Sequence, residues 1–235
     1  MTVTVFSSEK QAAKNLEPLK SLPFDMIAAV GGDGTFLKAF KKSADTGHPV
    51  LCVRSGKSKG VLAECELSEV ASVMGKLRDK NFSIVKYPML RGKTENRTSA
   101  GFNEISFFRT SEEALRFDLF INGVLFYGNL VADGGVVSTP AGSTAYNISA
   151  GGPVLDLESN SLVFTPLNPH GLNRPVVFEG SAKIIFRRNA AQTFADGRKF
   201  SGVKSHLEVS KSGKHANVIS LGTPFYARWK RLVGL

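Results

Sequence analysis

Residues 25–40 read DMIAAVGGDGTFLKAF, and this stretch decides how the first part of the chain folds. The unbroken apolar run 26–30 is typical of a parallel strand that is buried on both faces. Apolar residues then recur at helical spacing through Phe36 and Phe40, with lysines on the opposite side. A buried strand that ends in glycines and leads straight into a helix predicts an α/β layer with a ligand-binding edge at residues 31–35.

The same alternation of strand and helix extends on both sides of this stretch. Residues 2–6 and 49–53 read as further strands, and the apolar spacing within 67–77 predicts another helix. The polar segment that leads up to Leu19 also has helical spacing. We therefore expect residues 1–85 to form an α/β domain that carries the glycine loop.

After residue 82 the pattern changes to short apolar runs bounded by Gly, Pro, Asn or Ser. These strand-like runs are 82–87, 104–108, 117–121, 124–127, 162–165, 176–178, 183–186 and 207–209. The Asn122-Gly123 pair is a strong signal for a two-residue hairpin, and only 143–150 has an extended helical pattern. The expected fold class is thus α/β plus all-β. Residues 86–220 would form a β-rich domain, a sandwich or a barrel-like pair of sheets, and 221–235 would pack back onto the first domain.

The composition is that of a folded globular protein, since 42% of the 235 residues are hydrophobic and 21% are charged. No stretch reaches the ~18 apolar residues of a membrane-spanning helix. The first residues lack the basic start and long apolar run of a secretory signal. Cys52 and Cys65 have no CxxC motif or histidine cluster around them, which argues against a disulfide framework or structural zinc. We therefore expect a cytoplasmic protein.

The net charge of +10 indicates anionic partners. Nucleic acid, an acidic membrane surface and phosphate-bearing small molecules would all fit. The basic residues are scattered without a run of five or more, and no nucleic-acid-binding motif is present. We therefore favour nucleotides as the anionic partners and expect neither nucleic acid nor membrane.

The glycine loop 31–35 suits phosphate because glycines let the backbone come close and the N–H groups of the following helix face an anion. It is neither a Walker P-loop nor a dinucleotide GxGxxG. Asp33 repels a phosphate unless a cation or a proton intervenes. It could hold Mg²⁺ or accept the proton of an attacking hydroxyl; the alternative is that it caps the helix.

Two further segments suit a nucleotide. Residues 133–146, DGGVVSTPAGSTAY, lead from a strand through a Pro/Gly turn to a helix start. Their small residues and hydroxyls permit close approach of a flat ligand, with Tyr146 available to pack against it; a purely structural corner would read the same way. Asn103-Glu104 joins an amide to a carboxylate, a pair that can bind a base edge and two ribose hydroxyls.

Together these segments resemble the NAD kinases, which phosphorylate the 2′-hydroxyl of the adenosine ribose of NAD to form NADP. Residues 31–34 look like the GGDG motif of that family, and Asn103-Glu104 looks like its NE/D motif. Other matching segments are Asp133-Gly134, Ser138-Thr139-Pro140, 142–146, Gly151-Gly152-Pro153, Pro169-His170, 174–177 and Asp196-Gly197. Diacylglycerol and sphingosine kinases share GGDGT, so the later motifs decide for NAD.

The resemblance implies a phosphotransferase with an alcohol acceptor, two domains with NAD and ATP near their junction, and a homodimer or homotetramer. It implies ATP as donor, with polyphosphate as an alternative, and Mg²⁺ or another divalent cation. Asp33 would be the base or the metal-positioning carboxylate. The residues near the donor phosphates would be Gly31, Gly32, Gly34 and Thr35, and those that bind NAD would be Asn103, Glu104, Asp133, Thr144, Ala145, Tyr146, Ser149 and Asp196.

Some of these implied contacts are specific. Asn103 and Thr144 would contact adenine, and Glu104 would hold ribose hydroxyls. Asp133 would contact the nicotinamide half from a neighbouring subunit, and Asp196 would lie on the acceptor side.

The chain departs from the family at residues 54–62, RSGKSKGVL, where the family has an asparagine- and glycine-containing segment that leads to Gly-Phe-Leu. The basic residues Arg54, Lys57 and Lys59 would suit a highly charged donor, ATP or polyphosphate. Two other functions fit part of the pattern. A lipid kinase would share the GGDGT loop, and a regulator without activity would bind NAD or NADP without turnover.

Overall fold

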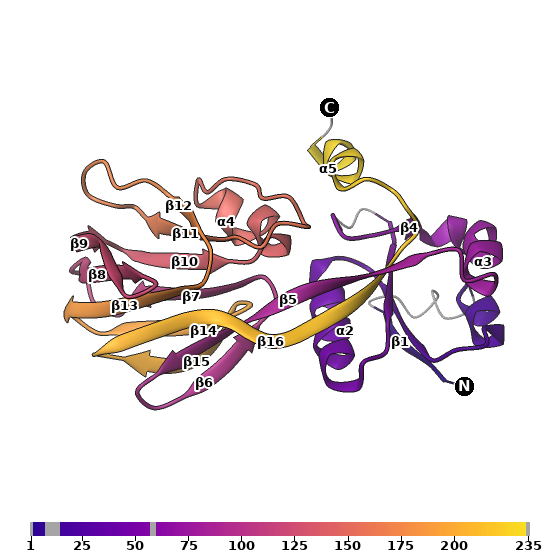
Figure 1. Ribbon diagram of the computed structural model, residues 1–235, viewed down its shortest axis with the longest axis horizontal. Coiled ribbons are helices and arrows are strands. Elements are labelled where there is room, and N and C mark those ends of the chain that lie inside the picture. Colours follow the sequence, from indigo (N-terminus) through magenta and orange to yellow (C-terminus); the bar gives the residue numbers. More distant parts are fainter. Residues whose placement is uncertain (1, 8–14, 57–59, 234–235) are drawn as a thin grey trace. The chain divides into compact units, whose positions relative to one another are not determined.

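The computed structural model describes residues 2–7, 15–56 and 60–233, and the chain divides into two compact units (Figure 1). Unit 1 comprises Met1–Tyr87 together with His215–Leu235, and unit 2 comprises Pro88–Lys214. Two long strands, β5 (Ser83–Thr94) and β16 (His206–Ser220), each have residues in both units.

Unit 1 is built on three parallel strands, β1 (Val3–Ser7), β2 (Met26–Val30) and β3 (Val50–Arg54). All five residues of β2 are buried, as its unbroken apolar run predicted. The strand joins β1 from Val3↔Met26 to Ser7↔Val30 and joins β3 from Ile27↔Val50 to Val30↔Val53. The remaining elements of this part are η1 (Glu17–Ser21), α2 (Asp33–Thr46), β4 (Cys65–Glu66), η2 (Leu67–Glu69) and α3 (Val70–Arg78).

The helices of unit 1 follow from local signals. Phe36, Ala39 and Phe40 place the buried side of α2 against the sheet, and the helix ends at Gly47, whose φ of 78° suits a residue without a side chain. A capping box of Glu66 and Glu69 starts η2, which continues into α3.

The C-terminal segment returns to unit 1, as expected. Val218 of β16 pairs with Val50 of β3, and α5 (Phe225–Val233) follows. Arg228 of α5 forms a buried ion pair with Glu64, whose side chain also accepts a hydrogen bond from the Leu221 backbone at 2.9 Å. Removal of either partner alone would be strongly destabilising, because it would leave an uncompensated buried charge.

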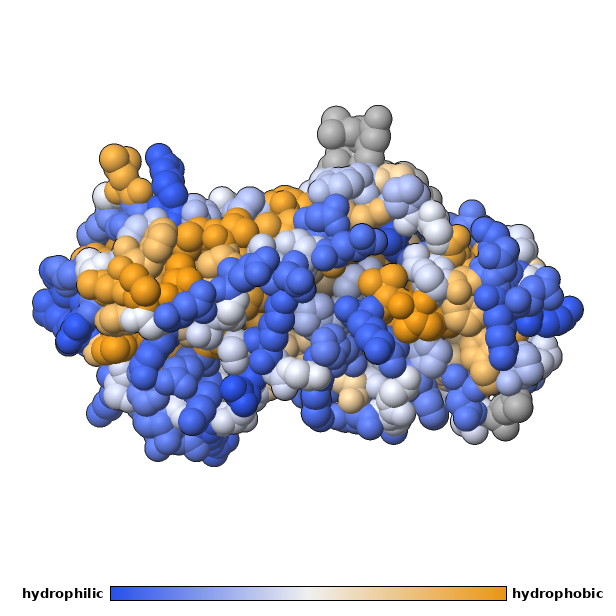
Figure 2. All heavy atoms as spheres, viewed as in Figure 1, coloured by the Kyte–Doolittle hydropathy of each residue, from blue (hydrophilic) through white to orange (hydrophobic). Residues whose placement is uncertain are grey.

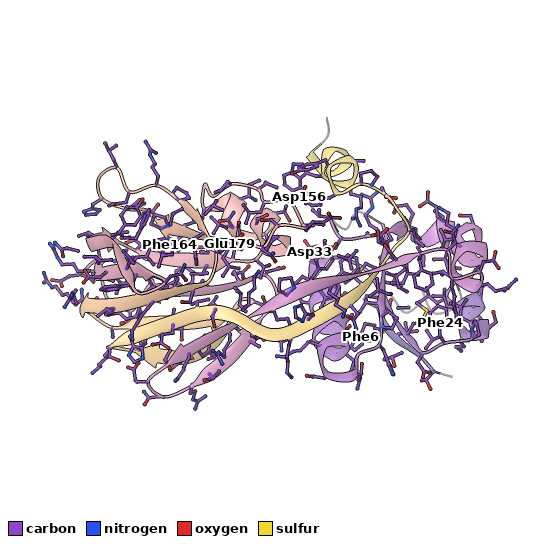
Figure 3. The ribbon with its side chains drawn as sticks, in the orientation of Figure 1. Phe6, Phe24, Asp33, Asp156, Phe164 and Glu179 are labelled. Carbon is purple, nitrogen blue, oxygen red and sulfur yellow. The ribbon has the colours of Figure 1, made fainter. Side chains whose placement is uncertain are left out.

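Unit 2 is a sandwich of two antiparallel sheets, which confirms the expected β-rich domain. One sheet has the order β12–β11–β10–β7–β14–β15, and the other has the order β16–β13–β8–β9, with β5 beside β16 and β6 beside β5. Phe107, Phe117 and Phe164 fill the core between the sheets, and Figure 3 marks Phe164 there. The strands not yet bounded are β6 (Thr98–Gly101), β7 (Glu104–Arg109), β8 (Leu115–Ile121), β9 (Val124–Ala132), β10 (Gly134–Ser138), β11 (Leu162–Leu167), β12 (Val176–Phe178), β13 (Ser181–Arg188), β14 (Ala191–Ala195) and β15 (Arg198–Val203).

Most local expectations for unit 2 are met, one is not, and some strands were not predicted. Asn122 and Gly123 both have positive φ, 51° and 83°, and join β8 to β9 as the predicted hairpin. The helix expected over 143–150 is instead a short 3-10 turn, η3 (Ala141–Thr144), followed by one α-helical turn, α4 (Tyr146–Ser149). The β14–β15 hairpin was not predicted. In unit 1, most of the segment before Leu19 lies outside the described residues.

No helix in the described ranges is long and apolar enough to cross a membrane.

Candidate nucleotide and phosphoryl-transfer site

The turn between β2 and α2 has the geometry of a phosphate loop. Gly31 has φ 142°, which only glycine adopts readily, and its N–H donates to the carbonyl of Val53 at 3.0 Å. Gly32 is the N-cap of α2, and its carbonyl accepts from the Thr35 N–H at 2.9 Å. The N–H groups at the very start of a helix have no partner within it, so they are available to an anion.

Asp33 is the first residue of α2 (Figure 3) and makes no side-chain cap. The alternative role as helix cap therefore does not apply. Partial desolvation by the surrounding protein raises the pKa of Asp33 to about 6, although the residue is exposed. The exposure of the side chain and the adjacent helix start both favour the charged form. Asp33 is therefore mainly a carboxylate at neutral pH.

Arg54, at the end of β3, and Gly60 both make contacts within unit 1. Arg54 forms an ion pair with Glu66, and its Nε donates to Glu66 Oε1 at 2.6 Å. Its guanidinium is thus already engaged within unit 1. Gly60 lies against α2, because a Cβ there would be 2.6 Å from the Phe36 ring. Lys57 and Lys59 lie outside the described residues.

In unit 2, the turn that precedes β7 is held by one carboxylate. Asp196 accepts hydrogen bonds from the backbone N–H groups of Phe102 at 2.8 Å, Asn103 at 2.8 Å and Glu104 at 3.3 Å. Its own N–H donates to the Glu104 carbonyl at 3.1 Å. Asp196 has φ 48° and starts the turn between β14 and β15 with Gly197. The hydrogen bonds make Asp196 a residue that positions Asn103 and Glu104.

Ser138 and Thr139, which lie at the end of β10 and just after it, also hold the Phe102–Glu104 turn. Thr139 donates its hydroxyl to the Phe102 carbonyl at 2.9 Å and its N–H to the Asn103 carbonyl at 2.9 Å. Ser138 also donates to the Asn103 carbonyl, at 3.2 Å. At Gly142 a Cβ would lie 2.0 Å from that carbonyl oxygen. Glycine is required there because the two backbones touch.

Glu104 is the chemically unusual residue of this turn. It is 6% exposed, and its Oε2 has no hydrogen-bond partner among the described residues. Burial, and then the charge of Asp196, raise the pKa of Glu104 to about 7. A buried carboxyl oxygen without a partner is costly to leave unpaired, so it marks a place where a ligand donor can bind.

Four more predicted NAD-binding residues lie on or between η3 and α4: Thr144, Ala145, Tyr146 and Ser149. Thr144 and Ala145 are half-buried, whereas Tyr146 and Ser149 are exposed. The Tyr146 ring lies 6.0 Å from that of Phe108, and burial, then the charge of Glu104, raise the pKa of its hydroxyl. The structure therefore brings these residues together with Asn103 and Glu104 in unit 2.

Buried Asn147, which the sequence analysis missed, holds this corner in place. Its amide nitrogen donates to the carbonyls of Ser143 at 3.0 Å and Pro153 at 2.9 Å, and its oxygen accepts from Thr165 at 2.7 Å. A Cβ on Gly152 would clash with it. An asparagine in the middle of an expected helix was the available signal, because asparagine favours caps and turns over helix interiors.

Asp133 lies elsewhere. It precedes β10, whose Gly134 pairs with Phe108, whereas Ser138 at the far end pairs with Glu104. Five residues of strand separate Asp133 from Ser138 by roughly 16 Å. Within one chain, Asp133 is therefore remote from the Asn103–Glu104 corner.

Two residues that were not predicted hold the Asp133 carboxylate. Arg109 forms an ion pair with it at 2.8 Å, and Asn168 donates to it at 3.0 Å. Asn168 has φ 46° and stands before Pro169. An asparagine before a proline indicates a turn, but not which side chain it contacts.

Among the residues that the structure describes, no group of three His, Cys, Asp or Glu side chains could hold a metal ion. Asp33 is a single carboxylate at a phosphate loop. That fits Mg²⁺, which binds one or two carboxylates together with substrate phosphates rather than a full protein cage.

The fold and these residues define a two-domain nucleotide-binding protein with a carboxylate-bearing phosphate loop in its α/β unit. Residues 3–82 match the ATP-NAD kinase N-terminal domain, and residues 103–221 match the ATP-NAD kinase C-terminal domain. The chain belongs to the NAD kinase family.

Comparison with individual proteins gives the same family. The chain is 34% identical over 191 residues to the NAD kinase of Flavobacterium psychrophilum, an alignment that covers 78% of this chain and 62% of that protein. It is 30% identical over 232 residues to that of Rickettsia bellii, covering 92% and 90%. The chain thus spans about three fifths of the first relative and nearly all of the second.

Two solved structures share the fold. An NAD kinase from Archaeoglobus fulgidus in complex with ATP has a TM-score of 0.84 at 22% identity, with all of both chains covered. A yeast NADH kinase complexed with NADH has a TM-score of 0.78 at 23% identity, covering 90% of this chain and 65% of that one.

Proposed function

We propose that this protein is an NAD kinase, which transfers the γ-phosphoryl group of ATP to the 2′-hydroxyl of the adenosine ribose of NAD. The observation that carries the proposal is the Glu104 carboxyl. It is buried, has an oxygen without a hydrogen-bond partner among the described residues, and stands beside Asn103 in a turn that hydrogen bonds with Asp196, Ser138 and Thr139 hold in place. A carboxylate so placed suits a vicinal pair of ribose hydroxyls.

The chemistry is assigned to the loop in unit 1. The N–H groups at the start of α2 bind the donor phosphates, with the glycines allowing close approach. The Asp33 carboxylate accepts the proton of the 2′-hydroxyl as that oxygen attacks the γ-phosphorus, and ADP leaves in line. Mg²⁺, held by Asp33 together with donor oxygens, would neutralise charge on the phosphates. No covalent enzyme intermediate is required, because positioning and charge neutralisation supply most of the catalysis.

The acceptor is assigned to unit 2. Asn103 and Thr144 bind the adenine and Glu104 binds the ribose, while Tyr146 packs against the base. Ala145 and Ser149 line the same surface. Asp196 acts through the backbone of the Phe102–Glu104 turn rather than through contact with NAD.

We further propose a homodimer or homotetramer in which Asp133 serves the site of a neighbouring subunit. Its separation from the Asn103–Glu104 corner within one chain supports this arrangement. The edge strand β9 offers a surface for a second copy, since it exposes Val124, Leu125 and Phe126, and Figure 2 shows hydrophobic side chains gathered on unit 2. In multi-angle light scattering, Phe126→Ser should shift the mass towards the monomer. An unchanged mass would exclude β9 as the interface.

Incubation with Mg-ATP and NAD, followed by detection with an NADP-specific dehydrogenase, tests the main proposal. The expected result is NADP in proportion to enzyme and time. Binding of NAD without any NADP would instead indicate a regulator without activity. Phosphorylation of diacylglycerol or sphingosine in vesicles, with NAD ignored, would indicate a lipid kinase.

Donor and acceptor range follow from parallel reactions. Rates with polyphosphate in place of ATP, and with NADH in place of NAD, show which donor and which acceptor the protein prefers. If the basic segment binds the donor, Lys57→Ala with Lys59→Ala should raise the KM for polyphosphate more than the KM for ATP. Equal activity of this variant with every donor would contradict a role for the two lysines.

A further inference from the structure

A hollow lies on the outer face of the second sheet of unit 2, away from the core. Its volume is about 560 Å³, and it is lined by residues of four neighbouring strands, among them Arg91, Lys93, Phe120, Lys183, Glu208 and Ser210. Small-molecule sites typically have volumes of about 300–1,000 Å³. None of these residues belongs to the proposed NAD or donor site.

The hollow follows from strand alternation and register. In β13, Ala182 and Ile184 point into the core, so Ser181 and Lys183 face outward. Ser181 pairs with Ser210 and Lys183 pairs with Glu208 on β16. The side chains of Ser181 and Ser210 are short, whereas those of Lys183 and Glu208 are long. The serines therefore form the floor of the hollow, and the lysine and glutamate form one of its sides.

The walls combine positive charge with an apolar side. Lys183 forms an ion pair with Glu208 at 2.9 Å, and its hydrogen bond lowers the pKa of Glu208, with smaller contributions from the charges of Lys183, His206 and Lys93. Arg91 makes a 3.5 Å contact with the uncharged Ser210 hydroxyl. The lining of the hollow thus includes three cations, Arg91, Lys93 and Lys183, and one carboxylate, Glu208. These four side chains together carry a net charge of +2. Phe120, half-buried beside Lys183, provides the apolar side.

We propose that this hollow binds a small organic phosphate, such as a nucleoside monophosphate, at a site separate from the catalytic one. Arg91 and Lys93 would bind the phosphate, the serine hydroxyls would donate further hydrogen bonds, and Phe120 would pack against the base. A continuous polyanion fits less well, because Glu208 stands in the wall.

Lysine acetylation read by mass spectrometry tests the site directly, without relying on activity. The full-length protein is treated with a limiting acetylating reagent, alone and with AMP or inorganic phosphate. AMP should slow acetylation of Lys93 and Lys183 at least threefold, inorganic phosphate should do so at higher concentration, and Lys204 and Lys211 should change by less than 1.5-fold. The variant Arg91→Ser should abolish the protection, whereas the matched control Arg188→Ser, on an arginine paired with Glu113 outside the hollow, should keep it.

Equal acetylation of Lys93 and Lys183 with and without 10 mM AMP would overturn the proposal, as would equal slowing at all lysines. Low reactivity of the two lysines that rises on dilution would also overturn it, because another copy of the chain would then cover the face. NADP formation is measured separately, so failure here leaves the proposed activity standing.

Discussion

The Gly31–Thr35 loop of unit 1 and the Phe102–Glu104 turn of unit 2 differ in how they are built. The loop is formed by residues that are adjacent in the sequence: the end of β2, a glycine turn and the start of α2. The turn is assembled from residues far apart in the chain, with Asp196 reaching over more than 90 residues and Thr139 over 37. A loop of this kind, built from adjacent residues, can recur in proteins that act on different substrates. The assembled turn is where this family's substrate choice would lie.

The largest effect is expected from Asp33→Asn. If the loop carries the chemistry, kcat should fall about 10²–10⁴-fold, the usual contribution of a general base, while the KM for NAD stays within about threefold. Steady-state rates of NADP formation measure both. Asp79→Asn, an exposed aspartate after α3 in the same unit, is the matched control. A kcat within about tenfold of wild type, ~1.4 kcal/mol, would remove Asp33 as the base.

A pair of glycine variants sharpens the contrast. Gly142→Ala places a methyl group 2.0 Å from the Asn103 carbonyl, and we expect it to cost about 3 kcal/mol or more of unfolding free energy. At Gly34 a Cβ meets nothing within 4 Å, so Gly34→Ala should fold and gain up to about 1 kcal/mol from helix propensity. Its activity should nevertheless fall at least tenfold, because the methyl group occupies the approach of the phosphates. Urea unfolding and NADP formation test the pair. A fully active Gly34→Ala would argue against phosphate binding at this loop.

Asp196→Asn tests whether the turn acts through its backbone. The amide nitrogen cannot accept a hydrogen bond, so at least one buried N–H of the turn loses its acceptor, at about 1–3 kcal/mol. We expect the KM for NAD to rise about tenfold, ~1.4 kcal/mol, with the KM for ATP within twofold. Asp156→Asn, at an exposed aspartate, is the control. Equal increases in both KM values would indicate general damage instead.

Glu104, whose pKa is about 7, should make the binding of NAD depend on pH. If the carboxylate form binds the ribose, the KM for NAD should fall about tenfold between pH 6 and pH 8, as the ionised fraction rises from roughly a tenth to nine tenths. Glu104→Gln should flatten this profile. An unchanged profile in the variant would mean that another group titrates.

The raised pKa of Glu104 also makes folding stability depend on pH. In the folded state this pKa is about 7, above the ordinary value of 4.5. Its contribution to stability is therefore fully present below pH 4.5 and is lost as the pH rises through 7. Glu104→Gln should lose less stability than wild type over that interval in urea unfolding.

Structure formed by neighbouring residues could be predicted from the sequence alone. The β2–loop–α2 unit and the Asn122-Gly123 hairpin depend on neighbouring residues, so apolar runs and turn residues predicted both. The β14–β15 hairpin was missed although its turn, Asp196-Gly197, has positive φ at both residues and is a two-residue hairpin signal like Asn122-Gly123. The helix expected over 143–150 was wrong in extent, because buried Asn147 bonds to Pro153 and Thr165 rather than continuing a helix.

The candidate site divides in the same way. Asp33, Asn103 and Glu104 were found from motifs that resemble a family. The positioning role of Asp196, and the contacts of Arg109 and Asn168 with Asp133, required the structure. Hydrogen bonds between distant segments leave little trace in residue spacing.

The central claim is that the loop carries the reaction and the turn carries the acceptor. Initial rates of NADP formation at pH 8, over a range of NAD concentrations and saturating Mg-ATP, test it with wild type, Asp33→Asn and Glu104→Gln side by side. Asp33→Asn should lower kcat at least 100-fold and keep the KM for NAD, whereas Glu104→Gln should raise that KM about tenfold and lower kcat less than Asp33→Asn does. Two variants that change kcat and KM in the same proportions would contradict this division of roles.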